Sequence, residues 1–250
     1  MDTGLFSEAD RARLSERVLE WARSDSRVVA AALVGSLAFG EADRWSDLDL
    51  TFAAADDESI SELLDDWTRK LAQDFDAAHL LDLQSGDTIF RVFLLPGCLQ
   101  FDLSFTPASN FGANGPKFKL LFGSAVEKPH APPPSAHELF GYAVHHVVRA
   151  RSSIERGRYW QAEYWISAAR NHALSLACRR RGLPAVYGRG FDALPADVRE
   201  SFAEARVTSL AKDELFRALG LVIEGLLREA EEVQSLATKL EPQLRKLIVK

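Results

Sequence analysis

The chain has 250 residues, 47% hydrophobic and 26% charged, which is ordinary for a soluble globular protein long enough to bury a full core. Its net charge of −6 argues against a nucleic-acid partner, since such a partner usually leaves a basic surface. We find no segment resembling a signal peptide and no apolar run of membrane-spanning length, so we expect a cytoplasmic protein with no membrane partner. Cys98 and Cys178 are far apart, and we expect both to be buried free thiols.

The first predicted elements are a helix and a strand. Residues Ser7 to Ser24 predict an amphipathic helix that covers a sheet. Ser7 is the expected N-cap, and Asp10, three residues later, would complete a capping box with it. The apolar run from Val28 to Val34 predicts a strand that stops at Gly35-Ser36. Glycine permits a tight turn, and a short helix opening at Ser36 would direct its free backbone N–H groups and the serine hydroxyl at an anion.

A second apolar run opens with Asp47 and Asp49. Side chains alternate along a strand, so both aspartates share a face with Thr51, while the leucines between them point to the other side. Two carboxylates at the edge of a core repel each other and lose water, a cost that Mg²⁺ removes when it binds them together with substrate phosphates. The alternative is a helix cap at Ser36 and solvated turn aspartates, which would leave Asp49 charged within an apolar strand.

The next pattern predicts a helix and a hairpin. Residues 59 to 75 have helical periodicity, and residues 79 to 83 and 88 to 95 predict two strands joined by a turn. Arg91 lies in the second of these strands. It could neutralise the carboxylates, but pairing with another nearby acid is the favoured interpretation.

The strand from Leu99 to Phe105 supplies a third carboxylate. Its polar face carries Gln100, Asp102 and Ser104, and the intervening residues are apolar. Asp102 can therefore lie beside Asp47 and Asp49, completing the ligand set of a two-metal site.

A loop rich in Ser, Asn, Gly and Pro follows at residues 107 to 116 and is typical of an active-site edge. Lys117 and Lys119 could contact phosphates, although a solvated pair is the safer interpretation. An edge strand is predicted at residues 118 to 122, and the proline-rich segment 129 to 135 predicts a linker.

Everything after this linker is predicted to be helical. His145 and His146 invite a metal interpretation, but packing or surface histidines are favoured because neighbouring residues on a helix diverge. Arg189 lies in a glycine-containing loop and could reach a phosphate or a substrate. The predicted helices span residues 136–156, 159–181, 196–205, 212–236 and 238–248.

The helix that begins at Tyr159 is aromatic near its start. Trp160 and Tyr164 could line a substrate pocket, or could pack against the preceding helix. Glu163 lies between them on an adjoining face, where it can be a surface glutamate paired within the helix.

The motifs of this chain resemble those of the nucleotidyltransferase superfamily with a polymerase-β-like core. They are Gly35-Ser36, then ten residues, then Asp47-x-Asp49, and later a strand centred on Asp102. The spacing and the helical second half look most like the antibiotic nucleotidyltransferases of the aminoglycoside and lincosamide type. This resemblance rests on motifs over roughly residues 28 to 105. Beyond them it rests on architecture alone.

The resemblance implies an α+β fold, with a small mixed-sheet nucleotidyltransferase core at residues 1–128 and an all-α helical bundle that binds the acceptor at residues 135–250. It implies transfer of a nucleoside monophosphate from a triphosphate, expected to be ATP, to an acceptor hydroxyl with release of pyrophosphate. The acceptor would be a small molecule, with an aminoglycoside or lincosamide antibiotic as the first expectation.

Site roles follow from the same resemblance. Asp47 and Asp49 would bind two Mg²⁺ ions, and Asp102 would bind one of them or accept the acceptor's proton. Gly35 and Ser36 would hold the terminal phosphates. In kanamycin-type members a glutamate of the helical domain is the base, a role that Glu163 would take here.

Two other functions stay open on the sequence. One is a nucleotidyltransferase-like binding module, either regulatory or of antitoxin type. The other is a nucleotidyltransferase that modifies a protein or RNA, because this core serves many acceptors. A homodimer is among the assemblies that the sequence leaves open.

Overall fold

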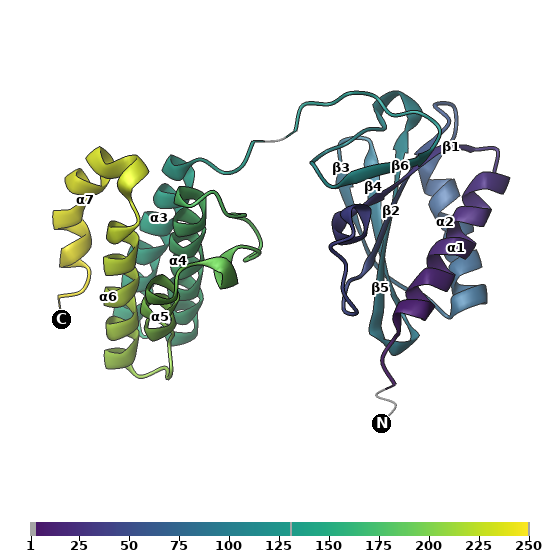
Figure 1. Ribbon diagram of the computed structural model, residues 1–250. Coiled ribbons are helices and arrows are strands. Elements are labelled where there is room, and N and C mark those ends of the chain that lie inside the picture. Colours follow the sequence, from purple (N-terminus) through teal and green to yellow (C-terminus); the bar gives the residue numbers. More distant parts are fainter. Residues whose placement is uncertain (1–3, 131, 250) are drawn as a thin grey trace. The chain divides into compact units, whose positions relative to one another are not determined.

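The computed structural model describes residues 4–130 and 132–249, which form two compact units, Met1–Ala131 and Pro132–Lys250 (Figure 1). The first contains a β-sheet and two long helices, and the second is helical. The α+β fold predicted from the sequence, a mixed sheet followed by a helical bundle, is confirmed. Across the described residues, no helix is long and apolar enough to cross a membrane.

The sheet of the first unit has six strands in the order β3-β4-β5-β2-β1-β6. The central neighbours β2 and β5 run parallel, and all other pairs are antiparallel, so the sheet is mixed. The predicted edge strand is confirmed as β6, beside β1. The strands are β1 (Val28–Val34), β2 (Leu48–Ala54), β3 (Ala78–Ser85), β4 (Thr88–Leu95), β5 (Leu99–Pro107) and β6 (Phe118–Phe122).

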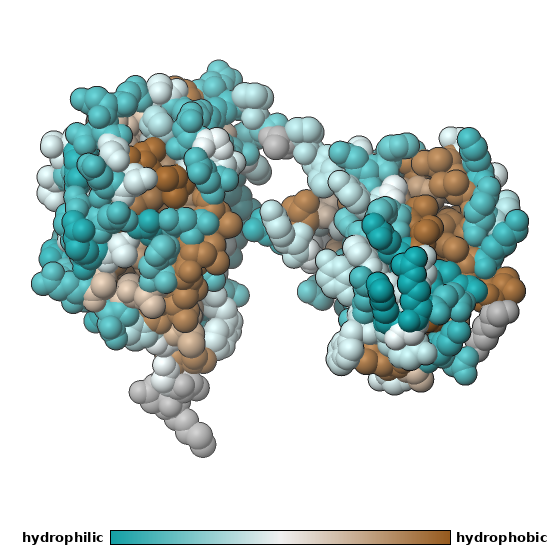
Figure 2. All heavy atoms as spheres, turned by 180° about the vertical axis from the view of Figure 1, so that it is seen from behind, coloured by the Kyte–Doolittle hydropathy of each residue, from teal (hydrophilic) through white to brown (hydrophobic). Residues whose placement is uncertain are grey.

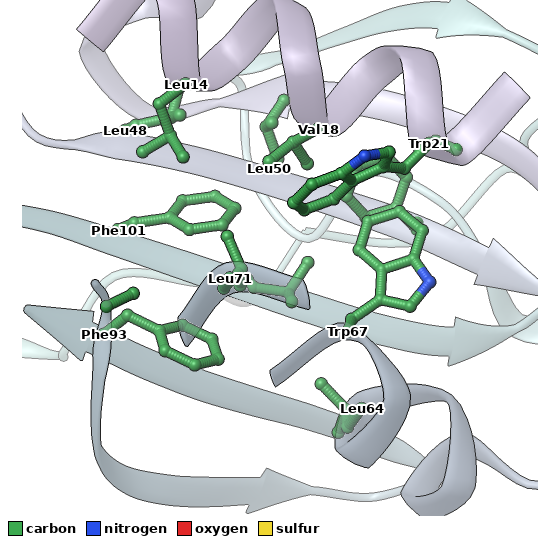
Figure 3. Close-up of a cluster of buried hydrophobic side chains, with 14 of the residues drawn as sticks. Leu14, Val18, Trp21, Leu48, Leu50, Leu64, Trp67, Leu71, Phe93 and Phe101 are labelled. Atoms are coloured by element: carbon green, nitrogen blue, oxygen red, sulfur yellow. The ribbon is translucent and has the colours of Figure 1, made fainter. Parts of the chain in front are cut away.

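Helices α1 (Glu8–Ser24) and α2 (Ile60–Phe75) cover one face of this sheet. The predicted capping box is confirmed: the Asp10 amide donates to Ser7 Oγ at 3.2 Å, and the Ser7 amide donates to an Asp10 carboxylate oxygen at 2.9 Å. Leu48, Leu50 and Phe101 point from the strands into the core beneath the helices (Figure 3). Because strand side chains alternate, the residues between them face the opposite side of the sheet.

Five longer helices form the second unit around two buried clusters. The predicted single helix over residues 212 to 236 is wrong, since α6 ends at Arg228. At the break, the buried Glu229 carboxylate meets Arg180 and Arg181, and the chain then turns so that Leu240 packs against the core. The helices are α3 (Ala136–Glu155), α4 (Tyr159–Arg180), α5 (Ala196–Glu204), α6 (Lys212–Arg228) and α7 (Gln234–Lys246).

Some side chains differ from the sequence predictions. Cys178 is a buried free thiol as predicted, but Cys98 is exposed because it lies in the short turn between β4 and β5, outside the helical cover. Hydrophobic side chains reach the surface of both units (Figure 2). Leu80 and Leu83 are among them because β3 is an edge strand beyond the helices, and all its residues are exposed.

Candidate functional site

Three aspartates meet on the face of the sheet opposite the helices. Asp49 of β2 and Asp102 of β5 are register partners across the parallel pair, and Asp47 lies one residue before β2 begins. One carboxylate oxygen from each lies within 4.8 Å of the other two. All three are half-buried. The structure therefore brings together the three predicted carboxylates, and their role as metal ligands stays a prediction.

The electrostatics of this cluster disfavour three full negative charges. Burial, and then the negative charge of Asp47, raise the pKa of Asp102. A hydrogen bond from Gln100 Nε2 to Asp102 Oδ1 at 3.0 Å opposes this rise. A crowded group of half-buried carboxylates also has affinity for a hard divalent cation, because oxygen ligands of this kind suit Mg²⁺.

The turn after β1 lies directly against the cluster. Gly35 has φ +72° and begins a short 3₁₀ helix, η1 (Gly35–Phe39). A Cβ built on Gly35 would overlap the Asp49 carboxylate. Only glycine allows both this backbone conformation and this close approach, so the geometry requires the residue that the motif supplies.

Ser36 lies inside η1, and its side chain does not cap it. In the part of the chain that the structure describes, its hydroxyl has no hydrogen-bond partner. The alternative of a helix cap at Ser36 is therefore wrong, while a phosphate role for this hydroxyl stays a prediction.

The loop that leads into Asp47 is held by Arg11, a residue that the sequence analysis did not single out. Arg11 is buried on α1 and donates from Nη1 to the carbonyl oxygens of Asp43 at 2.9 Å and Ser46 at 2.5 Å. The Asp43 carboxylate also accepts from the Trp45 amide at 2.8 Å. The sequence did carry one indication that Arg11 is buried, because it lies three residues before Leu14 on the apolar face of an amphipathic helix.

The other basic residues predicted near the site have their own partners. Arg91 forms a bidentate pair with Asp82, with both distances 2.7 Å, and contacts Asp65 at 3.0 Å. The favoured interpretation of Arg91 is confirmed, and neutralisation of the cluster by it is wrong. Lys117 forms an ion pair with Glu41 in which both side chains are largely exposed, in agreement with the prediction of a solvated lysine.

The second unit contains Glu163, on α4, which accepts a hydrogen bond from Ser167 Oγ at 2.7 Å. Its aromatic neighbours Trp160 and Tyr164 are 76% and 61% exposed. They do not pack into the helical core, so that alternative is wrong. Glu163 and the aspartates belong to different units, and its role as a base stays a prediction.

The histidines of the second unit form an aromatic cluster. The ring centroid of His146 lies 5.1 Å from the ring centroid of His172 and 5.0 Å from that of Trp165. Within residues 4–130 and 132–249, the group suited to hold a metal contains no histidine, so the packing interpretation is favoured. The Arg189 guanidinium stacks over Tyr187.

Comparisons with known proteins give matches among solved structures alone. No protein-family model matches the chain, and no curated protein matches it. Among solved structures, the chain is similar to an aminoglycoside 6-adenyltransferase from Bacillus subtilis, with 14% sequence identity and a TM-score of 0.41. That match covers 94% of this chain and 97% of the other. The activity therefore has to be argued from the residues themselves.

Proposed function

We propose that the chain is a metal-dependent nucleotidyltransferase that moves a nucleoside monophosphate from a triphosphate, ATP in the first instance, to a hydroxyl of a small molecule. Pyrophosphate is the other product. The observation that carries this proposal is the cluster of Asp47, Asp49 and Asp102, whose oxygens lie within 4.8 Å of one another against a turn that only glycine can make. Residues 1–128 would be the catalytic domain and residues 135–250 the acceptor domain.

The residues present fit two Mg²⁺ ions. Asp47 and Asp49 would hold both, and Asp102 would complete the set. When bound, such ions neutralise triphosphate charge and favour loss of the acceptor's proton. Gly35 lets the backbone of the η1 turn approach closely, and the Ser36 hydroxyl is available to donate to a phosphate oxygen.

The acceptor's proton has two candidate destinations. Asp102 is supported by its environment, because burial and Asp47 raise the pKa of its carboxyl, which favours its accepting a proton. Glu163 is the candidate that the resemblance suggests, supplied by the helical unit. A Glu163→Gln variant that loses about 10²–10⁴-fold in rate would assign the proton to Glu163, and an unchanged rate would leave it to Asp102.

The acceptor class follows from the resemblance to the antibiotic nucleotidyltransferases, and the similar solved structure is that of an aminoglycoside adenyltransferase. An aminoglycoside or lincosamide is therefore the acceptor to test first, which would make the activity one of antibiotic resistance.

The deciding experiment uses Asp49→Asn, with Asp87→Asn as the matched control in the exposed hairpin turn. Radiolabelled ATP, Mg²⁺ and a panel of acceptors are supplied, and pyrophosphate release is measured. We expect the wild type and Asp87→Asn to transfer label and Asp49→Asn to lose at least about 10²-fold. Near-normal transfer by Asp49→Asn would refute the metal assignment. Mg²⁺-dependent ATP binding without pyrophosphate from any acceptor would favour the binding module.

A further inference from the structure

A pocket within the second unit opens between α4, the short helix η4 (Phe191–Ala193) and α5. Its volume of about 350 Å³ is within the range of small-molecule sites. Its lining includes the apolar side chains of Leu174, Phe191 and Phe202. It also includes Asn171 and three arginines. The pocket therefore combines apolar surface with an excess of positive charge.

The three arginines are Arg170 of α4, Arg199 of α5 and Arg206, just after α5. Within the described residues, the side chains of Arg170 and Arg199 have no hydrogen bond or ion pair. Arg206 donates only from Nε, to the Ala203 carbonyl oxygen at 3.0 Å. The lining contains one acid, Asp192, so arginine charges exceed carboxylate charges by two.

Elsewhere the arginines in the last turn of α4 and at its C-cap have acidic partners. Arg181 meets Glu229 at 2.6 Å, and Arg179 meets Glu232 at 3.1 Å. Arg170 is half-buried without such a partner, and burial and the nearby Arg206 lower its pKa although Glu163 partly opposes this. Guanidinium groups stay charged in proteins, so this arrangement has a free-energy cost that an anion would remove.

We propose that this pocket binds a small organic anion through a phosphoryl or carboxylate group held by Arg170, Arg199 and Arg206. The planar guanidinium fork suits both oxyanions, the Asn171 amide adds a donor, and the apolar wall takes the body of the ligand. The charge of the unit agrees. Residues 132–250 contain 18 lysines and arginines against 14 aspartates and glutamates, whereas the whole chain has a net charge of −6. The pocket is formed by residues of the second unit alone, and the proposal does not depend on the proposed reaction.

The test is calorimetric titration of the full chain with inorganic phosphate and, in a second arm, with citrate. EDTA is present so that the aspartate cluster is without metal, and ionic strength is held constant with NaCl. We expect saturable binding in at least one arm, and the arms distinguish a phosphoryl from a carboxylate ligand. Arg199→Gln and Arg170→Gln should each lower the affinity about tenfold or more. Arg156→Gln is the control, because that side chain is exposed and outside the pocket.

A loss of anion affinity in these variants would not be caused by unfolding. Arg199 is exposed, and Arg170→Gln removes an uncompensated charge, so both variants should keep the wild-type melting temperature or exceed it. The anion should raise the melting temperature of the wild type and of Arg156→Gln only. No saturable binding in either arm would overturn the proposal. An equal loss in Arg156→Gln would also overturn it, since the effect would then be one of general charge.

Discussion

Two glycines of the η1 turn allow the candidate site to be perturbed with an internal control. Gly35 and Gly40 have φ values of +72° and +71°, at the two ends of the same 3₁₀ helix. Alanine at either position must adopt the left-handed conformation, which costs about 1–2 kcal/mol of folding free energy. The backbone penalties of Gly35→Ala and Gly40→Ala should therefore be nearly equal.

The two substitutions differ in what the new Cβ meets. At Gly40 nothing lies within 4 Å, whereas at Gly35 the Cβ overlaps the Asp49 carboxylate. Asp49 must then rotate away from Asp47 and Asp102, and the cluster loses one of its three ligands. Displaced ligand geometry commonly costs about 10–100-fold in metal affinity. We expect a loss of that size in Gly35→Ala and an affinity near that of the wild type in Gly40→Ala.

Two measurements separate these effects. Urea unfolding in EDTA reports the folding cost of each alanine, and titration with Mn²⁺, followed by its paramagnetic resonance signal, reports metal affinity. Equal Mn²⁺ affinities for Gly35→Ala and the wild type would refute the assignment of Asp49 as a ligand. An equal loss in Gly40→Ala would show that the turn acts only through folding.

Three further predictions concern other parts of the chain. Ser36→Ala should weaken ATP binding a few-fold in titrations and leave the free energy of unfolding in urea within about 0.5 kcal/mol of the wild-type value, since the hydroxyl has no hydrogen-bond partner among the described residues. Unchanged ATP affinity would exclude a phosphate role. Burial, and then the charges of His172 and His145, lower the pKa of His146 from 6.5 to about 4. Its contribution to folding stability should therefore be complete above pH 6.5 and decrease as the pH falls toward 4. His146→Phe should flatten the dependence of the melting temperature on pH over that window, and an unaltered dependence would contradict the burial argument. Glu229→Gln should cost about 3 kcal/mol in urea unfolding because Arg180 and Arg181 lose their buried carboxylate, and a cost near zero would show that water replaces it.

Local patterns in the sequence predicted much of the fold. The capping box at Ser7 and Asp10 needs only residues three apart, and the alternation around Asp49 needs only the two-residue period of a strand. The features that were missed depend on contacts between distant segments. The clamp from Arg11 to the carbonyl oxygen of Ser46 spans 35 residues, and the break after Arg228 positions Glu229 against Arg181, 48 residues away. The periodicity of a helix can indicate that Arg11 is buried, but it cannot indicate which distant residue the side chain contacts.

The strand register links the core of the first unit to its candidate site. Asp49 is paired with Asp102 in the same register that places Leu50 beside Leu103, and Phe52 beside Phe105, on the helix side. A slip of β2 by one residue would turn Asp49 into the core beneath α1 and α2, and would expose Leu50 where the carboxylates now meet. Packing of the helix-side residues thus enforces the position of the aspartates, although none of those apolar residues touches the reaction. The burial of apolar side chains on one face of β2 and β5 therefore holds the repelling carboxylates together on the other face of the same two strands.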